Sequence, residues 1–167
     1  MVGVIVPSEF ESKVIKIPHE VSGMGKIAAT AMAYSLVCRG VDKILLTGFC
    51  GSIRGYKIGE VVKPQMFIEG DYNTHPLEKY PNVIGVKHGV MISQDRFLVS
   101  NPYYFKYPKI ACDMESYAVA YVCKRFGMKF ECIKIVSDIV GSNSTDDFLD
   151  NCKKYAPKLH KVLKGYK

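Results

Sequence analysis

The sequence has no hydrophobic run long enough to cross a membrane. Its longest strongly apolar stretches have the length of strands, whereas a membrane-spanning helix needs ~20 apolar residues. It also has no repeat and no low-complexity segment. Its first residues, MVGVIVPSEFE, carry no basic segment and reach an acid at Glu9, which indicates a first strand and not a signal peptide. We therefore expect no membrane partner.

Six cysteines are present, but they form no CxxC pair and have no neighbouring histidine. Cys38, Cys123 and Cys132 lie inside apolar runs, where a thiol acts as a small core hydrophobe. This spacing argues against a disulfide framework and against a zinc site, so we expect no metal. Reduced thiols are typical of the cytoplasm, which is the predicted location.

The formal net charge of +7 raises the question of a nucleic-acid partner, but the basic residues are not grouped. Many of them lie in the last sixteen residues, CKKYAPKLHKVLKGYK, where Cys152, Tyr155 and Leu159 form a helical stripe and lysines fill the solvated face. Lysines near a helix C-terminus also complement the helix dipole. We therefore predict no nucleic-acid partner.

The 167 residues suit one domain, residues 1–167, in which strand and helix patterns alternate. Apolar strands are expected at 2–6, 42–48 and 129–138, with a weaker strand at 13–18 and a glycine-rich turn after Thr47. Further strands are expected within EVVKPQMFIEG and GVKHGVMIS, and helices after SGMGK, from MES onward and at the C-terminus. In the helix after SGMGK, the residues expected to face the core are Ile27, Ala31, Tyr34 and Cys38. This α/β pattern predicts a three-layer α/β/α fold around a twisted, mostly parallel mixed sheet.

Polar groups follow several of the predicted strands, at the edge of the sheet where sites form in such folds. Asp138 directly follows the apolar strand IKIVS, and it is either a loop or cap aspartate or a general acid with a raised pKa. Glu115 stands at the head of an apolar stripe that continues at Ala118, Val119, Val122, Cys123 and Phe126. It is either a capping acid turned to solvent or a buried carboxylate that binds ligand hydroxyls. Glu9 and Glu11 follow the first strand and are a weaker signal of the same kind.

Four segments in chain order resemble one family. They are VSGMGKIAATAMAYSLVCRGVDKILLTGFCGSI, KIGEVVKPQMFIEGDYN, GVMISQDRFL and DMESYAVAYVCKRFGMKFECIKIVSD. Together they resemble the purine nucleoside phosphorylase/nucleosidase superfamily, in register from residue 2 to about 149. Within it they are most similar to the 5'-methylthioadenosine/S-adenosylhomocysteine nucleosidases. DME followed by SD at this spacing is the most specific part of the resemblance.

The resemblance implies a role for each matching residue. Asp138 would protonate the purine N7 and so improve the leaving group, while Glu11 would position or deprotonate the attacking water. Glu115 would bind the ribose 2'- and 3'-hydroxyls and, with Glu11, stabilise an oxocarbenium-like sugar. The other residues implied to contact the base, sugar, water or anion are Met114, Phe97, Leu98, Phe49, Ser137 and Lys134. The family calls for no metal and no cofactor, and it implies a homodimer or higher homo-oligomer, because a neighbouring subunit completes the pocket.

The chain departs from the family at four places. It is short between the first strand and SGMGK and again between FLVS and KIACD, and it has Phe49 in place of a serine and Lys134 in place of an arginine. These segments and positions help to form the 5'-substituent pocket and to hold the water or anion. They leave open a member of the fold that binds a nucleoside without cleaving it.

Phosphorylases of this superfamily hold phosphate with arginines after the first strand and before the glycine-rich turn. Here the first segment, VPSEFESK, has two acids and no arginine, and Leu46 precedes Thr47. Phosphate beside Glu9 and Glu11 is unfavourable, because like charges at ~4 Å cost several kcal/mol at intermediate dielectric. Arg54 is the one nearby arginine in the sequence. We therefore predict an N-ribosyl hydrolase for a purine or purine-like nucleoside, with a phosphate-dependent phosphorylase as the alternative.

Overall fold

A computed structural model describes residues 1–71, 83–86, 88–96, 98, 107–141 and 145–166. In this part of the chain, nine strands form one mixed sheet. The strands are β1 (Val2–Val6), β2 (Glu20–Val21), β3 (Lys43–Arg54), β4 (Val61–Val62), β5 (Met66–Glu69), β6 (Val83–Gly85), β7 (Val90–Ser93), β8 (Ile110–Asp113) and β9 (Lys129–Ile139). Their order is β2-β1-β3-β8-β7-β5-β6, and β9 pairs with β3 and β4.

The long strand β3 organises the sheet. Its first half pairs in parallel with β1, its second half pairs antiparallel with β8, and β9 runs parallel to it along the other edge. The carboxyl ends of β1, β8 and β9 consequently come together along residues 46–52 of β3. Open α/β sheets place their sites at such edges.

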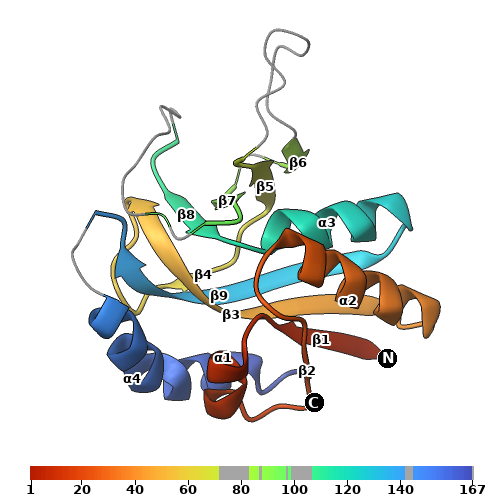
Figure 1. The fold of residues 1–167 in the computed structure, drawn as a ribbon, viewed down its shortest axis with the longest axis horizontal. Coiled ribbons are helices and arrows are strands. Elements are labelled where there is room, and N and C mark those ends of the chain that lie inside the picture. Colours follow the sequence, from red (N-terminus) through yellow and green to blue (C-terminus); the bar gives the residue numbers. More distant parts are fainter. Residues whose placement is uncertain (72–82, 87, 97, 99–106, 142–144, 167) are drawn as a thin grey trace, which may run out of the picture.

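Four helices cover the two faces of the sheet in the described residues. Figure 1 shows α2 (Lys26–Cys38) and α3 (Ser116–Arg125) on one face, and α1 (Glu9–Val14) and α4 (Thr145–Leu163) on the other. Buried apolar side chains fill the space on both sides, which is the three-layer arrangement predicted from the sequence. None of these helices is both long and apolar enough to span a membrane.

The predicted strand at 13–18 is wrong. The chain there begins as helix α1 and then continues as a loop to β2. The reason is a local cap: the Ser8 hydroxyl accepts a hydrogen bond from the Glu11 backbone N–H, and Glu9 and Glu11 occupy the first turn, where acids favour a helix. The predicted glycine-rich turn after Thr47 is also wrong, because β3 continues without interruption to Arg54 and pairs with β8 and β9 throughout.

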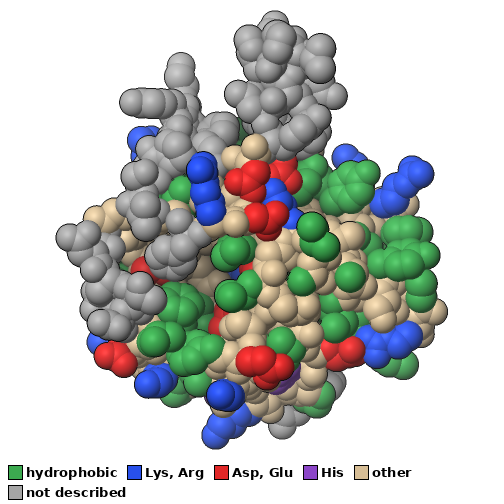
Figure 2. Space-filling model, in the orientation of Figure 1, with side chains coloured by type: hydrophobic (Ala, Val, Ile, Leu, Met, Phe, Trp, Pro, Cys, Tyr) green, Lys and Arg blue, Asp and Glu red, His purple; other side chains and the backbone are tan. Residues whose placement is uncertain are grey.

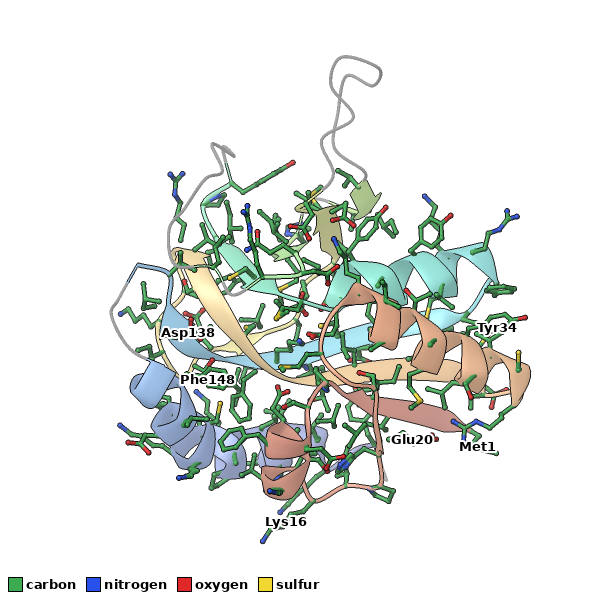
Figure 3. The ribbon with its side chains drawn as sticks, viewed as in Figure 1. Met1, Lys16, Glu20, Tyr34, Asp138 and Phe148 are labelled. Atoms are coloured by element: carbon green, nitrogen blue, oxygen red, sulfur yellow. The ribbon has the colours of Figure 1, made fainter. Side chains whose placement is uncertain are left out.

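The predicted buried face of α2 is wrong as well. Ile27 is 86% exposed and Tyr34, which can be located in Figure 3, is 50% exposed. The buried residues of α2 are Ala29, Ala33 and Leu36, which belong to the core cluster on this side of the sheet. Both sets recur at helical spacing, so the pattern could not distinguish them, and small alanines let a helix pack closely against its neighbours. On α3 the predicted stripe is buried from Ala118 to Cys123, but Phe126 lies past the helix end and is 49% exposed.

Candidate active site

A cavity of about 720 Å³ opens where β1, β8 and β9 end. Figure 2 shows the hollow on this face, with hydrophobic side chains around it. Six of the residues predicted from the sequence line it: Glu11, Phe49, Leu98, Met114, Glu115 and Asp138. The carboxylates from α1, from the head of α3 and from the end of β9 therefore share one space.

Asp138 stands at the end of β9, close to the start of α4 (Figure 3). Its register with β3 shifts between Cys50 and Gly51, which is an irregularity of the kind that redirects a side chain near a site. The Ser137 hydroxyl donates a hydrogen bond to Asp138 Oδ1 at 2.8 Å. Burial raises the pKa of Asp138, and this hydrogen bond opposes the rise. Burial therefore favours the protonated form of Asp138, which is the form that a general acid needs.

Gly51 leaves room for Asp138. A methyl group on Gly51 would lie 3.0 Å from Asp138 Oδ2 and 2.9 Å from the Cys112 sulfur. Ser137 itself is buried behind the acid, and its hydroxyl is also 3.2 Å from the Cys50 carbonyl oxygen. Ser137 therefore contacts Asp138 and not the cavity.

Glu11 is buried and lines the same cavity. Its Oε1 accepts a hydrogen bond from the Phe49 backbone N–H at 2.8 Å, and its Oε2 accepts one from the Ser8 hydroxyl at 2.8 Å. Burial raises the pKa of Glu11, while the charge of Lys134 and these two hydrogen bonds lower it. Gly48 makes this position possible, because a methyl group there would lie 2.4 Å from Glu11 Oε1.

Glu115 is the N-cap residue of α3, and it is buried and not turned to solvent. Its side chain does not cap its own helix. Oε1 instead accepts a hydrogen bond from the Gly25 backbone N–H at 3.0 Å, and Oε2 lies 3.4 Å from Lys134 Nζ. Burial raises the pKa of Glu115 to about 7, against the opposing effect of Lys134 and with a contribution from Asp113.

Asp113 is a site residue that was not predicted from the sequence. It caps α3, since the Ser116 backbone N–H donates to its carboxylate at 3.2 Å, and it forms an ion pair with Lys134 at 2.7 Å. The Ser93 hydroxyl donates to its Oδ1 at 2.6 Å. Although burial opposes ionisation, the Lys134 charge lowers the pKa of Asp113. A signal existed: a lysine in the apolar strand IKIVS needs a buried acid as partner, and the DME motif contains one.

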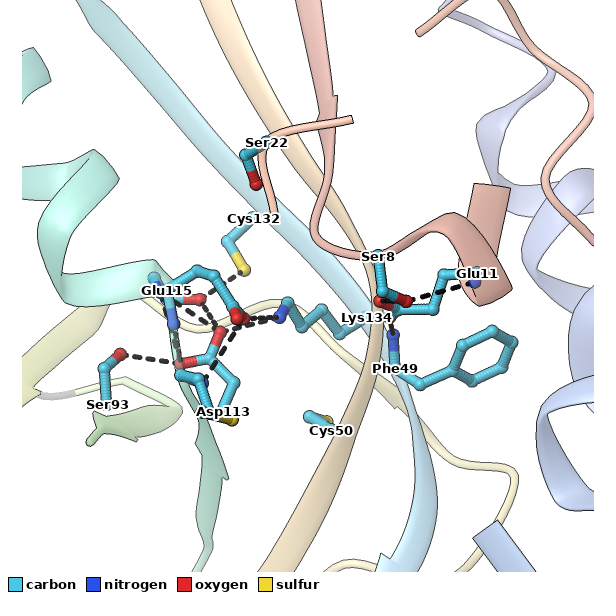
Figure 4. Close-up of polar contacts among 12 residues, drawn as sticks. Ser8, Glu11, Ser22, Phe49, Cys50, Ser93, Asp113, Glu115, Cys132 and Lys134 are labelled. Carbon is cyan, nitrogen blue, oxygen red and sulfur yellow. Dashed lines mark hydrogen bonds and ion pairs between the residues drawn. The ribbon is translucent and has the colours of Figure 1, made fainter. Parts of the chain in front are cut away.

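Lys134 is fully buried, and its ammonium group lies between Asp113 and Glu115 (Figure 4). It is not among the residues that line the cavity. Its position is therefore behind the acids, whereas the family resemblance implied contact with water or an anion.

Phe49 contributes its backbone to the site and its ring to the core. The ring belongs to the apolar cluster between the sheet and α4, with Leu45, Cys152 and Leu159, while its N–H points to Glu11. The added bulk relative to serine therefore lies mainly in the core. Leu98 and Met114 line the cavity, and Phe97 lies outside the described residues. In the described part of the chain, no group of three or more histidine, cysteine or acidic side chains is arranged to hold a metal ion.

The fold and the shared cavity of acids are those of an α/β protein with a site at the ends of its strands. Comparison with known proteins identifies the family. The chain belongs to the phosphorylase superfamily, whose family model matches residues 16–84 and 78–166. This confirms the family predicted from the sequence.

Individual relatives carry narrower names. A 5'-methylthioadenosine/S-adenosylhomocysteine nucleosidase of Thermotoga maritima is 27% identical over 152 residues, which cover 79% of this chain and 70% of the relative. An aminodeoxyfutalosine nucleosidase of Helicobacter pylori is 25% identical over 176 residues, which cover 86% of this chain and 76% of the relative. Both are named as nucleosidases, in agreement with the predicted N-ribosyl hydrolase.

A solved structure shares the fold. It is an aspartate-to-asparagine variant of the Helicobacter pylori 5'-methylthioadenosine/S-adenosylhomocysteine nucleosidase with 5'-methylthioadenosine in its active site. It superposes with a TM-score of 0.84 at 20% identity and covers 98% of this chain and 96% of its own. This confirms the predicted fold class.

Proposed function

We propose that the protein hydrolyses the N-glycosidic bond of a purine or purine-like nucleoside of the methylthioadenosine/S-adenosylhomocysteine type. The observation that carries this proposal is the shared cavity, in which Glu11, Glu115 and Asp138 converge from three separate elements. The names of the relatives support a purine nucleosidase.

Asp138 is the general acid in this proposal. Its raised pKa keeps a proton available, and transfer of that proton to the purine N7 withdraws electrons from the glycosidic bond. Its placement at the end of a rigid central strand, with Ser137 behind it, fixes the direction of the acid. Leu98 and Phe97 are proposed to hold the base beside it.

Glu115 is proposed to bind the ribose hydroxyls. One of its oxygens receives the Gly25 N–H and the other lies near Lys134, so the carboxylate is held in one orientation before the sugar arrives. Met114 lines the cavity next to it and is proposed to lie under the ribose. Orientation of this kind in advance lowers the entropic cost of reaching the transition state.

Glu11 is proposed to position and deprotonate the attacking water. The Phe49 N–H and the Ser8 hydroxyl fix its two oxygens. As the bond to the base breaks, the sugar becomes oxocarbenium-like, and the charges of Glu11 and Glu115 stabilise it. The bound water then adds to the sugar carbon and gives its proton to Glu11.

The charge of the cavity favours water over phosphate. Five acids line it, Glu9, Glu11, Asp113, Glu115 and Asp138, whereas Arg96 is the one cationic side chain among its described lining residues. Arg54 is not among those residues. Even with Asp138 protonated and Asp113 paired with Lys134, a phosphate dianion would meet the carboxylates of Glu9, Glu11 and Glu115, which is costly at short distance.

Self-association is part of the proposal. The outer surfaces of α2 and α3 expose Ile27, Tyr34, Tyr121 and Phe126 to solvent in the single chain. Exposed apolar side chains in neighbouring positions are typical of an interface, and we propose that a second copy of the chain covers them.

A nucleoside panel tests the function. Purified protein is incubated with 5'-methylthioadenosine, S-adenosylhomocysteine, adenosine and inosine, each with and without phosphate, and free base is measured by chromatography. We expect base release from at least one nucleoside without phosphate. Release that requires phosphate supports the phosphorylase alternative, whereas a nucleoside that raises the melting temperature but stays intact supports a binding protein without turnover.

A further inference from the structure

The ion pair between Asp113 and Lys134 joins an acid that lines the cavity to a lysine that is buried behind it. Lys134 starts on β9 opposite Gly48, the residue packed against Glu11, and its ammonium group reaches Asp113 at 2.7 Å and Glu115 at 3.4 Å. All three side chains are almost fully buried, with 1–4% of their surface exposed. Neither Asp113 nor Lys134 is needed in the proposed reaction as an acid, a base or a nucleophile.

The charged groups around Glu115 include more negative than positive ones. Lys134 is the positive group, and the carboxylates of Asp113 and Glu11 are the negative groups whose fields reach Glu115. The Gly25 N–H donates to it from the start of α2, and the Cys132 thiol lies nearby on β9. One buried lysine is therefore shared between several acids, and the larger part of its attraction goes to Asp113, which is closer by 0.7 Å.

We propose that Asp113 is a positioning residue that controls the protonation of Glu115 through Lys134. This inference rests on the proposed function, in which ionised Glu115 accepts hydrogen bonds from the ribose hydroxyls. Asp113 holds the ammonium group at a longer distance from Glu115 than a direct pair would have. Glu115 consequently keeps its proton to a higher pH, and the enzyme binds the sugar fully only when that proton has left.

The two partners act on Glu115 in opposite directions. Removal of the Asp113 charge takes away a repulsive neighbour and frees Lys134 to pair with Glu115, which favours the ionised form. Removal of the Lys134 charge takes away the attractive neighbour, which favours the protonated form. A purely structural pair would lower activity in both variants without separating their pH dependence.

The test measures kcat/KM for 5'-methylthioadenosine against pH in the wild type, Asp113→Asn and Lys134→Met. We expect the acid limb of the profile to move down by about one pH unit or more in Asp113→Asn and up by about one unit or more in Lys134→Met. The charge-conserving variant Lys134→Arg should keep the limb within about half a unit. In a Glu115→Gln background the shift caused by Asp113→Asn should fall to less than half, because Glu11 alone then titrates.

The outcomes separate the inference from the function on which it rests. If the wild type releases no base from any nucleoside, the proposed function fails. If the wild type is active but the acid limbs of Asp113→Asn and Lys134→Met coincide or move in the same direction, Asp113 has no control over Glu115. Should either single variant not fold, Asp113→Asn/Lys134→Met removes both charges together and leaves neither partner unpaired. In that double variant the limb should lie within about half a unit of the wild type, and a shift of more than one unit contradicts the inference.

Discussion

Replacement of Asp138 by asparagine separates catalysis from stability. The amide keeps the size of the side chain and can still accept the Ser137 hydrogen bond, but it cannot transfer a proton. General acid catalysis contributes about 100- to 10,000-fold, so kcat should fall by at least two orders of magnitude, or about 3 kcal/mol of transition-state stabilisation.

The stability of the same variant should not fall. Because burial raises the pKa of Asp138, the unfolded chain loses this proton at a lower pH than the folded chain does. The carboxyl group thus costs the folded state stability as pH rises through its folded pKa, and asparagine removes that cost. At pH 7–8 the melting temperature of Asp138→Asn should equal or exceed that of the wild type, with the difference disappearing below about pH 4.

The assay is base release from the best substrate of the panel, together with thermal unfolding at several pH values. Asp150→Asn is the matched control, because Asp150 is an exposed aspartate on α4 and its replacement should change neither quantity. Activity of Asp138→Asn within threefold of the wild type, with an intact fold, would refute the assignment of the general acid.

Three further predictions follow from the site and the surface. Glu11→Gln should lower kcat by about 100-fold with KM within threefold, because the side chain acts on the water and not on the nucleoside; a change confined to KM contradicts this role. Gly48→Ala should lower both activity and melting temperature more than Gly40→Ala. Both glycines have positive φ, but only the methyl group at Gly48 meets a carboxylate, whereas Gly40 has open space around it. Equal effects of the two substitutions would show that the contact with the carboxylate is unimportant. Ile27→Asp should convert an oligomer to a smaller species in light scattering, whereas Lys153→Asp on α4, an exposed position on the other face of the sheet, should leave it unchanged, and an unaltered mass for Ile27→Asp argues against this interface.

The architecture was largely predictable from the sequence. The strands β1, β3 and β9 carry runs of consecutive apolar residues, such as Ile44–Leu46 in β3, because their central positions are buried on both faces, and such runs can be recognised in the sequence. The acids Asp138 and Glu115 stood out for a related reason. Each interrupts or ends an apolar element, so its position at the edge of the sheet followed from the pattern alone.

Other features of the site were not predictable because they join residues far apart in the chain. Gly25 and Glu115 are separated by 90 residues, and Glu11 and Phe49 by 38, and only the strand order brings them together. The family resemblance likewise implied that Lys134 contacts the water or anion, whereas in the structure its ammonium group forms ion pairs with Asp113 and Glu115.

The sequence by itself determined the α/β class, the main apolar strands, the helices after SGMGK, from MES onward and at the C-terminus, and the acids Asp138 and Glu115 at their ends. The tertiary structure decided that α2 buries its alanines and exposes Ile27, that the ring of Phe49 enters the core, and that Asp113 pairs with Lys134. The physical reason is the range of the interactions. Periodicity and capping act between neighbours along the chain, whereas close packing and buried ion pairs depend on which distant surfaces meet.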